Sequence, residues 1–322
     1  MDIPTLRDIL SARQAIKPYL APTPFYHYPA LDALTGAEVY VKHENYQPVG
    51  AFKVRGGINL VSRLTADERA RGLIAASTGN HGQSIAYAGR LFGAQVTIVV
   101  PEKANPGKVA AIQALGAAVE FHGAKFDDAV LRAEILAAER GYRYVHAGNE
   151  PLLIAGVATY ALEMVETVPD LDVILVPVGS GTGLSGVCIA AKALSPSIRV
   201  IGVQSAESPS GYDSWRSGHI VSGRNDSFSE GIATGRGMEL PQQILRERLD
   251  DFVLVPDSAI RRAMVWMIER AHTLAESAGA APLAAAVQIK DQLAGKKIGL
   301  VCSGGNSSLD HLREALNAAL PS

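Results

Sequence analysis

The sequence GLIAASTGNHGQ, residues 72–83, passes from a short apolar run into a cluster of hydrogen-bonding side chains. The run Leu73–Ala76 is typical of a buried strand, and two hydroxyls, an asparagine and a histidine follow it between glycines. Loops at the end of a strand often carry function, although a turn before a capped helix would use the same residue types. The stretch therefore predicts a strand, a loop and a helix, with the loop as a candidate site.

Strands and helices alternate along the rest of the chain as well. Apolar residues three and four positions apart predict helices in 129–141 and 260–277, and the polar segment 222–231 predicts a long loop. The predicted strands are Glu38–Lys42, Leu73–Ala76, Gln95–Val100, Tyr142–His146, Val173–Val178, Val200–Gln204, Phe252–Val255 and Ile298–Cys302. Their continuous hydrophobicity indicates strands covered on both faces. The pattern predicts an α/β fold with mostly parallel sheets.

Composition excludes several classes of protein. A chain of 322 residues suggests one large domain or two, and a net charge of -2 argues against nucleic-acid binding. The longest apolar run, 280–287, is far shorter than the roughly 18–20 residues that cross a bilayer, and the N-terminus has no signal pattern. Cys188 and Cys302 are far apart and have no metal or redox spacing, which favours a reducing cytoplasm. Both are expected to be small buried hydrophobic residues.

Glycine-containing loops follow strands or begin helices at four places. They are residues 47–57, 77–83, 178–186 and 302–308. In open α/β sheets, ligands bind outside the carboxyl ends of the strands. The loops that follow Ala76, Val178 and Cys302 are therefore expected to meet at one site.

The loop 178–186, VGSGTGLSG, suits a phosphate. Its glycines permit tight turns, and the helix after it offers free backbone N–H groups to an anion. A turn without a ligand is the plain alternative. The spacing Gly181-x-Gly183-x-x-Gly186 also matches a dinucleotide fingerprint, but no acidic residue stands about 20 positions on to bind a ribose.

Two further positions gain meaning from chemistry. Lys53 lies between Phe52 and Val54, where apolar neighbours would lower the pKa of its amine and suit it to covalent catalysis, although most lysines are simply solvated. Ser303 ends a strand, where its hydroxyl could meet a ring nitrogen of a ligand or cap a helix.

Taken together and in this order, GAFKVRGG (50–57), STGNHGQ (77–83), GSGTG (179–183) and CSGGN (302–306) resemble the motifs of fold type II pyridoxal-phosphate enzymes, the tryptophan synthase β type. Within that group the chain is most similar to threonine/serine dehydratases, also called threonine ammonia-lyases, and to serine racemases. The other similar segments are 22–31, 39–57, 149–163, 229–235 and 275–285.

The resemblance implies pyridoxal 5′-phosphate as cofactor and a role for each matching residue. Lys53 would hold the cofactor covalently and then act as the proton-transfer base, and Thr78 would be the second catalytic residue. The implied cofactor-binding residues are Phe52 and Lys53 at the ring, Asn80 at the 3′-oxygen, Gly179, Ser180, Gly181, Thr182 and Gly183 at the phosphate, Glu276 beside the site and Ser303 at the ring nitrogen. The implied substrate-binding residues are Ser77, Thr78, Gly79, Asn80 and His81, which would receive the carboxylate.

The resemblance also implies an architecture and a reaction. Residues 1–66 and 151–322 would form a large cofactor-binding domain, and 72–149 a small substrate-binding α/β domain, with the cofactor in the cleft. The reaction would be β-elimination from L-threonine or L-serine, which yields a 2-oxoacid and ammonia. A homodimer is implied, with an amino acid as the small-molecule substrate and no nucleic-acid or membrane partner. The family's regulatory domain would have no counterpart here, which favours a catabolic role.

Departures from the relatives leave alternatives open. Racemases have serine where this chain has Thr78, and dehydratases often have alanine, so we predict that dehydration dominates. Where some relatives bind a divalent cation this chain has Gln204, Ser208 and Ser210, with Glu207 out of register, so we predict no metal. The alternatives are racemisation, β-replacement, elimination from 3-hydroxyaspartate, or a nicotinamide-dependent or purely binding α/β protein.

Overall fold

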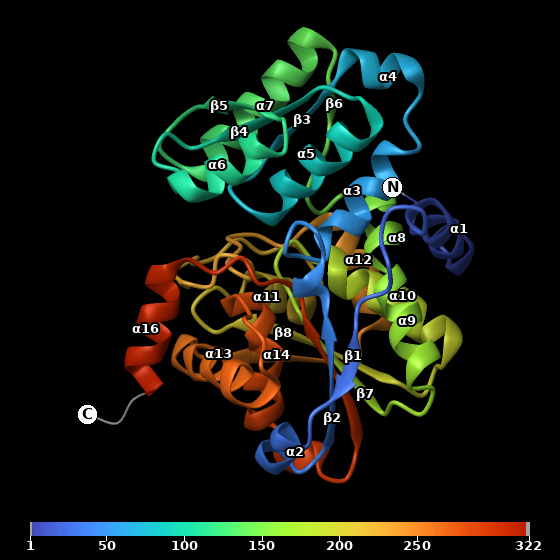
Figure 1. Ribbon diagram of the computed structural model, residues 1–322, viewed down its shortest axis with the longest axis vertical. Helices are drawn as coiled ribbons and strands as arrows, with labels where there is room; N and C mark the ends of the chain where they lie inside the picture. The colour runs from blue at the N-terminus through green and yellow to red at the C-terminus, as the bar shows by residue number, and fades with distance from the viewer. Residues whose placement is uncertain (1, 320–322) are drawn as a thin grey trace.

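The computed structural model describes residues 2–319, whose strands form two separate sheets (Figure 1). The six-stranded sheet has the order β1-β2-β10-β7-β8-β9, and the four-stranded sheet has the order β5-β4-β3-β6. Only β1 pairs antiparallel, with β2; the other pairings are parallel. The strands are β1 Phe25–His27, β2 Glu38–His43, β3 Leu73–Ala76, β4 Val96–Val100, β5 Ala118–Phe121, β6 Arg143–Tyr144, β7 Val173–Pro177, β8 Arg199–Ser205, β9 Asp251–Val255 and β10 Lys297–Cys302. The predicted α/β fold with mostly parallel sheets is confirmed.

Helices cover both faces of each sheet. Around the large sheet lie α1 Leu6–Ile16, α2 Pro29–Thr35, α9 Thr159–Thr167, α10 Thr182–Leu194, α11 Ser210–Ser217, α12 Glu239–Arg248, α13 Asp257–Ala271, α14 Ser277–Gln288, α15 Lys290–Leu293 and α16 Leu309–Ala319. The 3-10 helix η1 Glu44–Tyr46 follows β2 and contacts β10. Around the small sheet and between the two sheets lie α3 Lys53–Val61, α4 Ala66–Arg71, α5 Asn80–Phe92, α6 Pro106–Ala114, α7 Phe126–Arg140 and α8 Pro151–Val157. Separate apolar cores lie on the two faces of the large sheet. The strands are therefore buried on both faces, as their continuous hydrophobicity predicted.

Three glycines let α3, α5 and α8 approach one another closely. A Cβ atom at Gly57 would lie 2.6 Å from the Ser84 carbonyl oxygen, and one at Gly156 would lie 2.7 Å from the Arg55 carbonyl oxygen and 2.8 Å from the Cα of Gly56. Any larger residue would push these helices apart. The close packing fixes α3, which begins at the candidate lysine, against helices on both sides.

All eight predicted strands are present, but β1 and β5 were not predicted. Strand β1 has three residues and one buried side chain, and β5 is half-exposed at the edge of its sheet, so neither shows a continuous apolar run. The helix predicted over 260–277 ends earlier, at Ala271. His272 ends it with a φ of 52°, and its N–H donates to the Met267 carbonyl.

The predicted small domain, residues 72–149, contains every strand of the four-stranded sheet, while its exact boundaries stay a prediction.

Cys188 and Cys302 are buried and free, as expected. Between residues 2 and 319, the structure has no helix with the length and apolar character needed to cross a membrane.

Candidate active site

A cavity of about 470 Å³ lies where loops from both sheets meet. Every residue that the sequence analysis placed at the site lines this cavity: Phe52, Lys53, Ser77, Thr78, Gly79, Asn80, His81, Gly179, Ser180, Gly181, Thr182, Gly183, Glu276 and Ser303. The loops follow β3, β7 and β10, as expected. They do not share one sheet edge, however, because β3 belongs to the small sheet. The site therefore lies between the two sheets.

Lys53 is the first residue of α3, and the chain just before it pairs with the loop after β10. Phe52 donates its N–H to the Ser303 carbonyl at 3.0 Å, and Gly305 donates to the Gly50 carbonyl at 2.9 Å. The Lys53 amine donates to the hydroxyls of Ser180 at 3.0 Å and of Thr182 at 2.8 Å. Burial lowers the pKa of Lys53 to about 8, as its apolar neighbours predicted.

The glycine-rich loop 179–183 can hold only glycine at several positions. Gly181 has a φ of +88°, and a Cβ there would lie 2.6 Å from the Pro241 side chain. A Cβ at Gly179 would lie 2.2 Å from the Gly231 carbonyl oxygen. Because α10 begins at Thr182, its first N–H groups have no partner within the helix and are available to an anion. The loop thus has the backbone and hydroxyl donors that a phosphate needs.

The loop 77–81 leads into α5 and is shaped by a serine. The Ser77 hydroxyl oxygen accepts hydrogen bonds from the N–H groups of Gly79 at 3.2 Å and Gly82 at 3.0 Å. Since α5 begins at Asn80, the N–H groups of Asn80 and His81 have no partner inside the helix. This helix start is suited to a carboxylate.

The His81 side chain is directed into the protein, which changes its expected role. Its Nε2 lies 3.1 Å from the Val145 carbonyl oxygen, to which it donates when it carries the proton. Burial, together with the nearby Lys53 charge, lowers the pKa of His81 to about 3. The imidazole is therefore neutral, so His81 is able to attract a carboxylate through its backbone N–H only.

Asn80 connects the two sheets through its side-chain amide. Its Nδ2 donates to Glu276 Oε1 at 2.9 Å, and its Oδ1 accepts from Asn306 Nδ2 at 2.8 Å. Burial is the largest influence on the Glu276 carboxyl and raises its pKa to about 7, although the hydrogen bond from Asn80 lowers it. Glu276 also precedes the first residue of α14, so it is both a helix-end residue and part of the site. Asn306 was not assigned a role from the sequence.

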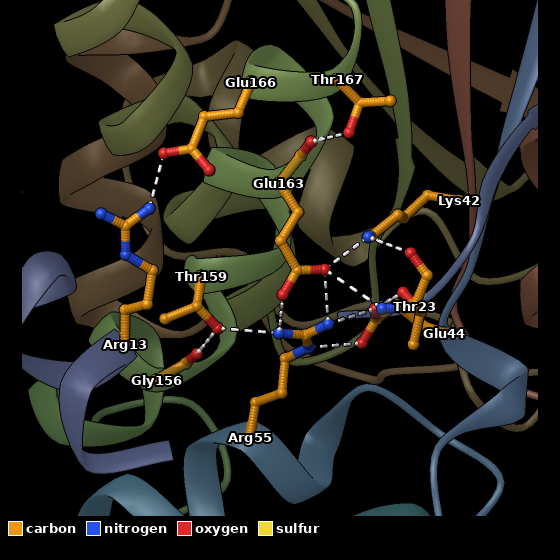
Figure 2. Close-up of polar contacts among 10 residues, drawn as sticks. All are labelled: Arg13, Thr23, Lys42, Glu44, Arg55, Gly156, Thr159, Glu163, Glu166 and Thr167. Atoms are coloured by element: carbon orange, nitrogen blue, oxygen red, sulfur yellow. Dashed lines mark hydrogen bonds and ion pairs between the residues drawn. The ribbon is translucent and has the colours of Figure 1, made fainter. Parts of the chain in front are cut away.

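Lys42, Glu44, Arg55 and Glu163 form an ion cluster in the interior of the protein (Figure 2). Arg55 donates to Glu44 through Nε and Nη2, both at 2.8 Å, and to Glu163 through Nη1 at 2.6 Å and Nη2 at 2.9 Å. The Lys42 amine lies 2.5 Å from Glu163 Oε2. Two positive charges are thus balanced by two negative ones.

Electrostatics keeps Arg55 and Glu44 of this cluster charged. Burial alone would lower the pKa of Arg55, but the carboxylates of Glu44 and Glu163 raise it above its ordinary value. Burial would likewise raise the pKa of Glu44, but Arg55 and Lys42 hold it below its ordinary value. Since Arg55 is in the first turn of α3, the cluster fixes the start of the helix that carries Lys53.

Several cavity-lining residues were missed by the sequence analysis. They include Lys108, Phe126, Glu230, Asn306 and His311. Only Glu230 and Asn306 had a signal, since they lie in the quoted segments 229–235 and 302–306, and nothing in the sequence indicates that distant Lys108 faces Glu230. These residues come from helices and loops far apart in the chain, so only the folded structure brings them to the cavity.

Comparisons with known proteins give a consistent result. A family model described as pyridoxal-phosphate dependent enzyme matches residues 16–304, a range that includes every strand in residues 2–319. The chain is 38% identical over 318 residues to L-threonine ammonia-lyase of Thermotoga maritima, covering 98% of this chain and 79% of that protein. It is 38% identical over 307 residues to L-threo-3-hydroxyaspartate ammonia-lyase of Saccharomyces cerevisiae, covering 95% and 94%. The solved structure of serine racemase from Dictyostelium discoideum is 35% identical, with a TM-score of 0.89 over 95% of this chain and 99% of that one.

Proposed function

This chain belongs to the family of pyridoxal-phosphate-dependent enzymes, and on that premise we propose that it is an ammonia-lyase acting on L-threonine or L-serine. The reaction would eliminate the β-hydroxyl as water, and hydrolysis of the product would give a 2-oxoacid and ammonia. One observation carries this proposal: a buried lysine, a phosphate-type loop and a carboxylate-type helix start all open into one cavity.

The residues present fit the cofactor. Lys53 would hold it covalently, the loop 179–183 would bind its phosphate, and Phe52 would lie against its ring. Asn80 and Ser303 would contact its 3′-oxygen and ring nitrogen. When bound, pyridoxal phosphate supplies an electron sink for the negative charge that develops at the substrate Cα.

The protein's own groups would position the substrate and move its protons. The start of α5 would bind the α-carboxylate through N–H groups, which directs the Cα–H bond at a fixed base. Lys53 would take the Cα proton, because burial leaves an appreciable fraction of its amine neutral near pH 7 to 8. The neutral hydroxyl of Ser303, unlike a carboxylate, would not keep a proton on the ring nitrogen, which favours elimination over a long-lived carbanion.

Racemisation is the second candidate, and one observation favours it. The Thr78 side chain lines the same cavity as Lys53 and carries a hydroxyl where racemases have serine. Its β-branch restricts χ1, so we propose that it handles protons poorly and that elimination prevails.

The coarser organisation of the protein is proposed on the same basis. Residues 1–66 and 151–322 would form the large cofactor-binding domain, and 72–149 the small substrate-binding domain, in a homodimer. Two buried, free cysteines support a location in the reducing cytoplasm. We also retain the proposal that no metal binds at Gln204, whose amide nitrogen lies 3.2 Å from Thr234 Oγ1.

A panel of amino acids tests the activity. The holoenzyme is expected to release 2-oxoacid from L-threonine and L-serine, and Lys53→Ala to lose at least about 10²-fold in kcat. Thr78→Ser is expected to gain racemisation of serine, which chiral chromatography would measure. If the wild-type protein formed D-serine faster than pyruvate, racemisation would be its main activity. A colourless protein that binds a nicotinamide cofactor would contradict the whole proposal.

A further inference from the structure

We propose that an ion pair in the cavity wall disfavours substrates whose side chain carries a carboxylate, an inference that rests on the proposed ammonia-lyase function. The pair, here called the wall pair, consists of Lys108 on α6 and Glu230 in the segment between α11 and α12. Both residues line the cavity. The two charges come from opposite sides of the site, because α6 packs with the small sheet.

Hydrogen bonds anchor the chain on both sides of Glu230, whose side chain is half-exposed. Before it, the Ser227 hydroxyl donates to Asp257 Oδ1 at 2.7 Å, and Asp257 is buried at the start of α13. After it, the buried Gln204 amide donates to Thr234 Oγ1 at 3.2 Å. The segment that carries Glu230 is therefore a fixed wall of the cavity.

The wall pair lies beside the groups proposed to bind cofactor and substrate. Gly231, the next residue after Glu230, lies close to Gly179. A Cβ atom added at Gly179 would lie 2.2 Å from the carbonyl oxygen of Gly231. Burial is the main cause of the raised pKa of Glu276, but the Lys108 charge lowers this pKa and the Glu230 charge raises it. Both charges thus act on the carboxyl group that accepts a hydrogen bond from Asn80.

The cavity lining leaves no lysine or arginine free for a second carboxylate. Within the described residues, the lysines and arginines of its lining are Lys53 and Lys108 alone. Lys53 is assigned to catalysis, and Lys108 is already paired with Glu230. The imidazole of His311 packs edge-on against Phe228, with ring centroids 5.5 Å apart.

A substrate with a carboxylate at Cβ would have to compete with Glu230 for Lys108. It would then lie close to the Glu230 carboxylate, and like charges that are brought together disfavour binding. The methyl group of threonine or the hydrogen of serine meets no such repulsion. Phe126, which also lines the cavity, adds an apolar surface to it.

The test compares L-threonine with L-threo-3-hydroxyaspartate in the wild-type holoenzyme and in Glu230→Gln. We expect the wild type to prefer threonine, and the substitution to raise the ratio of kcat/KM for hydroxyaspartate over threonine several-fold, the size of one half-exposed charge interaction. Glu239→Gln is the matched control, because Glu239 forms an ion pair with Arg236 outside the cavity lining and its loss should leave the ratio unchanged.

Binding of unreactive acids gives a second measurement that does not depend on turnover. Calorimetric titration of the holoenzyme should show succinate gaining affinity relative to butyrate in Glu230→Gln. An unchanged ratio in both measurements would overturn the inference, as would a wild type that prefers hydroxyaspartate. An equal loss for both substrates would also overturn it, since the pair would then only hold the two sides together. A wild type inactive on every substrate would refute the proposed function instead. The titration would still test whether the wall pair disfavours a second carboxylate.

Discussion

Replacing Glu163 by glutamine should destabilise the protein far more than the same change at Glu166. Both glutamates lie on α9, three residues apart, and each forms an ion pair with an arginine: Glu163 with Arg55 at 2.6 Å and Glu166 with Arg13 at 2.5 Å (Figure 2). They differ in burial, since 13% of the Glu163 side chain is exposed and 57% of the Glu166 side chain. Glu163 also pairs with Lys42, so the comparison sets a buried carboxylate with two cationic partners against an exposed carboxylate with one.

The expected magnitudes follow from the charges left behind. Glu163→Gln keeps the shape but leaves the positive charges of Lys42 and Arg55 with Glu44 alone, a net buried charge of about one unit. Breaking a buried pair in this way costs about 3–5 kcal/mol, whereas an exposed pair contributes roughly 0–1 kcal/mol. The melting temperature should fall by on the order of 10 °C for Glu163→Gln and by only a few degrees for Glu166→Gln.

Urea and thermal unfolding, followed by circular dichroism on both variants, measure the difference. Adding Lys42→Met to Glu163→Gln restores the charge balance and should recover part of the lost stability. Equal melting temperatures for the two single variants would refute the reasoning, because the buried carboxylate with two cationic partners would then contribute no more than the exposed one. A double variant less stable than Glu163→Gln would show that packing, and not charge, decides the cost.

Two further predictions concern α3 and its lysine. Gly156→Ala should cost about 1–3 kcal/mol in unfolding free energy, because the new Cβ would lie 2.7 Å from the Arg55 carbonyl oxygen, whereas Gly223→Ala, with nothing within 4 Å, should change the urea midpoint little. If both alanine variants unfold alike, the helix contact is looser than described. The rate at which pyridoxal phosphate attaches to the apoprotein, followed by stopped-flow absorbance, should rise with pH through about 8, because only the neutral Lys53 amine reacts. A rate independent of pH from about 6 to 9 would contradict a pKa in that range.

Prediction from the sequence succeeds where a local run of residues indicates one structure by itself. The strands β7 and β10 are continuous apolar runs, and the loop 179–183 has glycines that no other residue could replace. The short β1 and the half-exposed β5 carry no such signal, because each depends on pairing with a neighbouring strand.

The site was predicted loop by loop, while its pair interactions were not. Lys53 and Asn80 stand in motifs that can be recognised in the chain. By contrast, the wall pair joins positions 122 residues apart, and the Arg55 contact with Glu163 joins positions 108 apart. Such contacts depend on how helices from both sheets are packed, which local patterns do not contain. The inward direction of the His81 ring has the same origin, since its partner is the carbonyl of Val145.

The strand order lets the two sheets form at different times during synthesis. The four strands of the small sheet are contiguous in the chain, from β3 to β6, so they can pair as soon as residue 144 has left the ribosome. The large sheet must wait, because β10 lies between β2 and β7 and is the last strand to emerge. The carbonyl of Ser303, directly after β10, accepts a hydrogen bond from the N–H of Phe52, the residue before Lys53. A complete cofactor pocket thus requires β10: a nascent chain that lacks this strand would have a folded small sheet and an incomplete pocket.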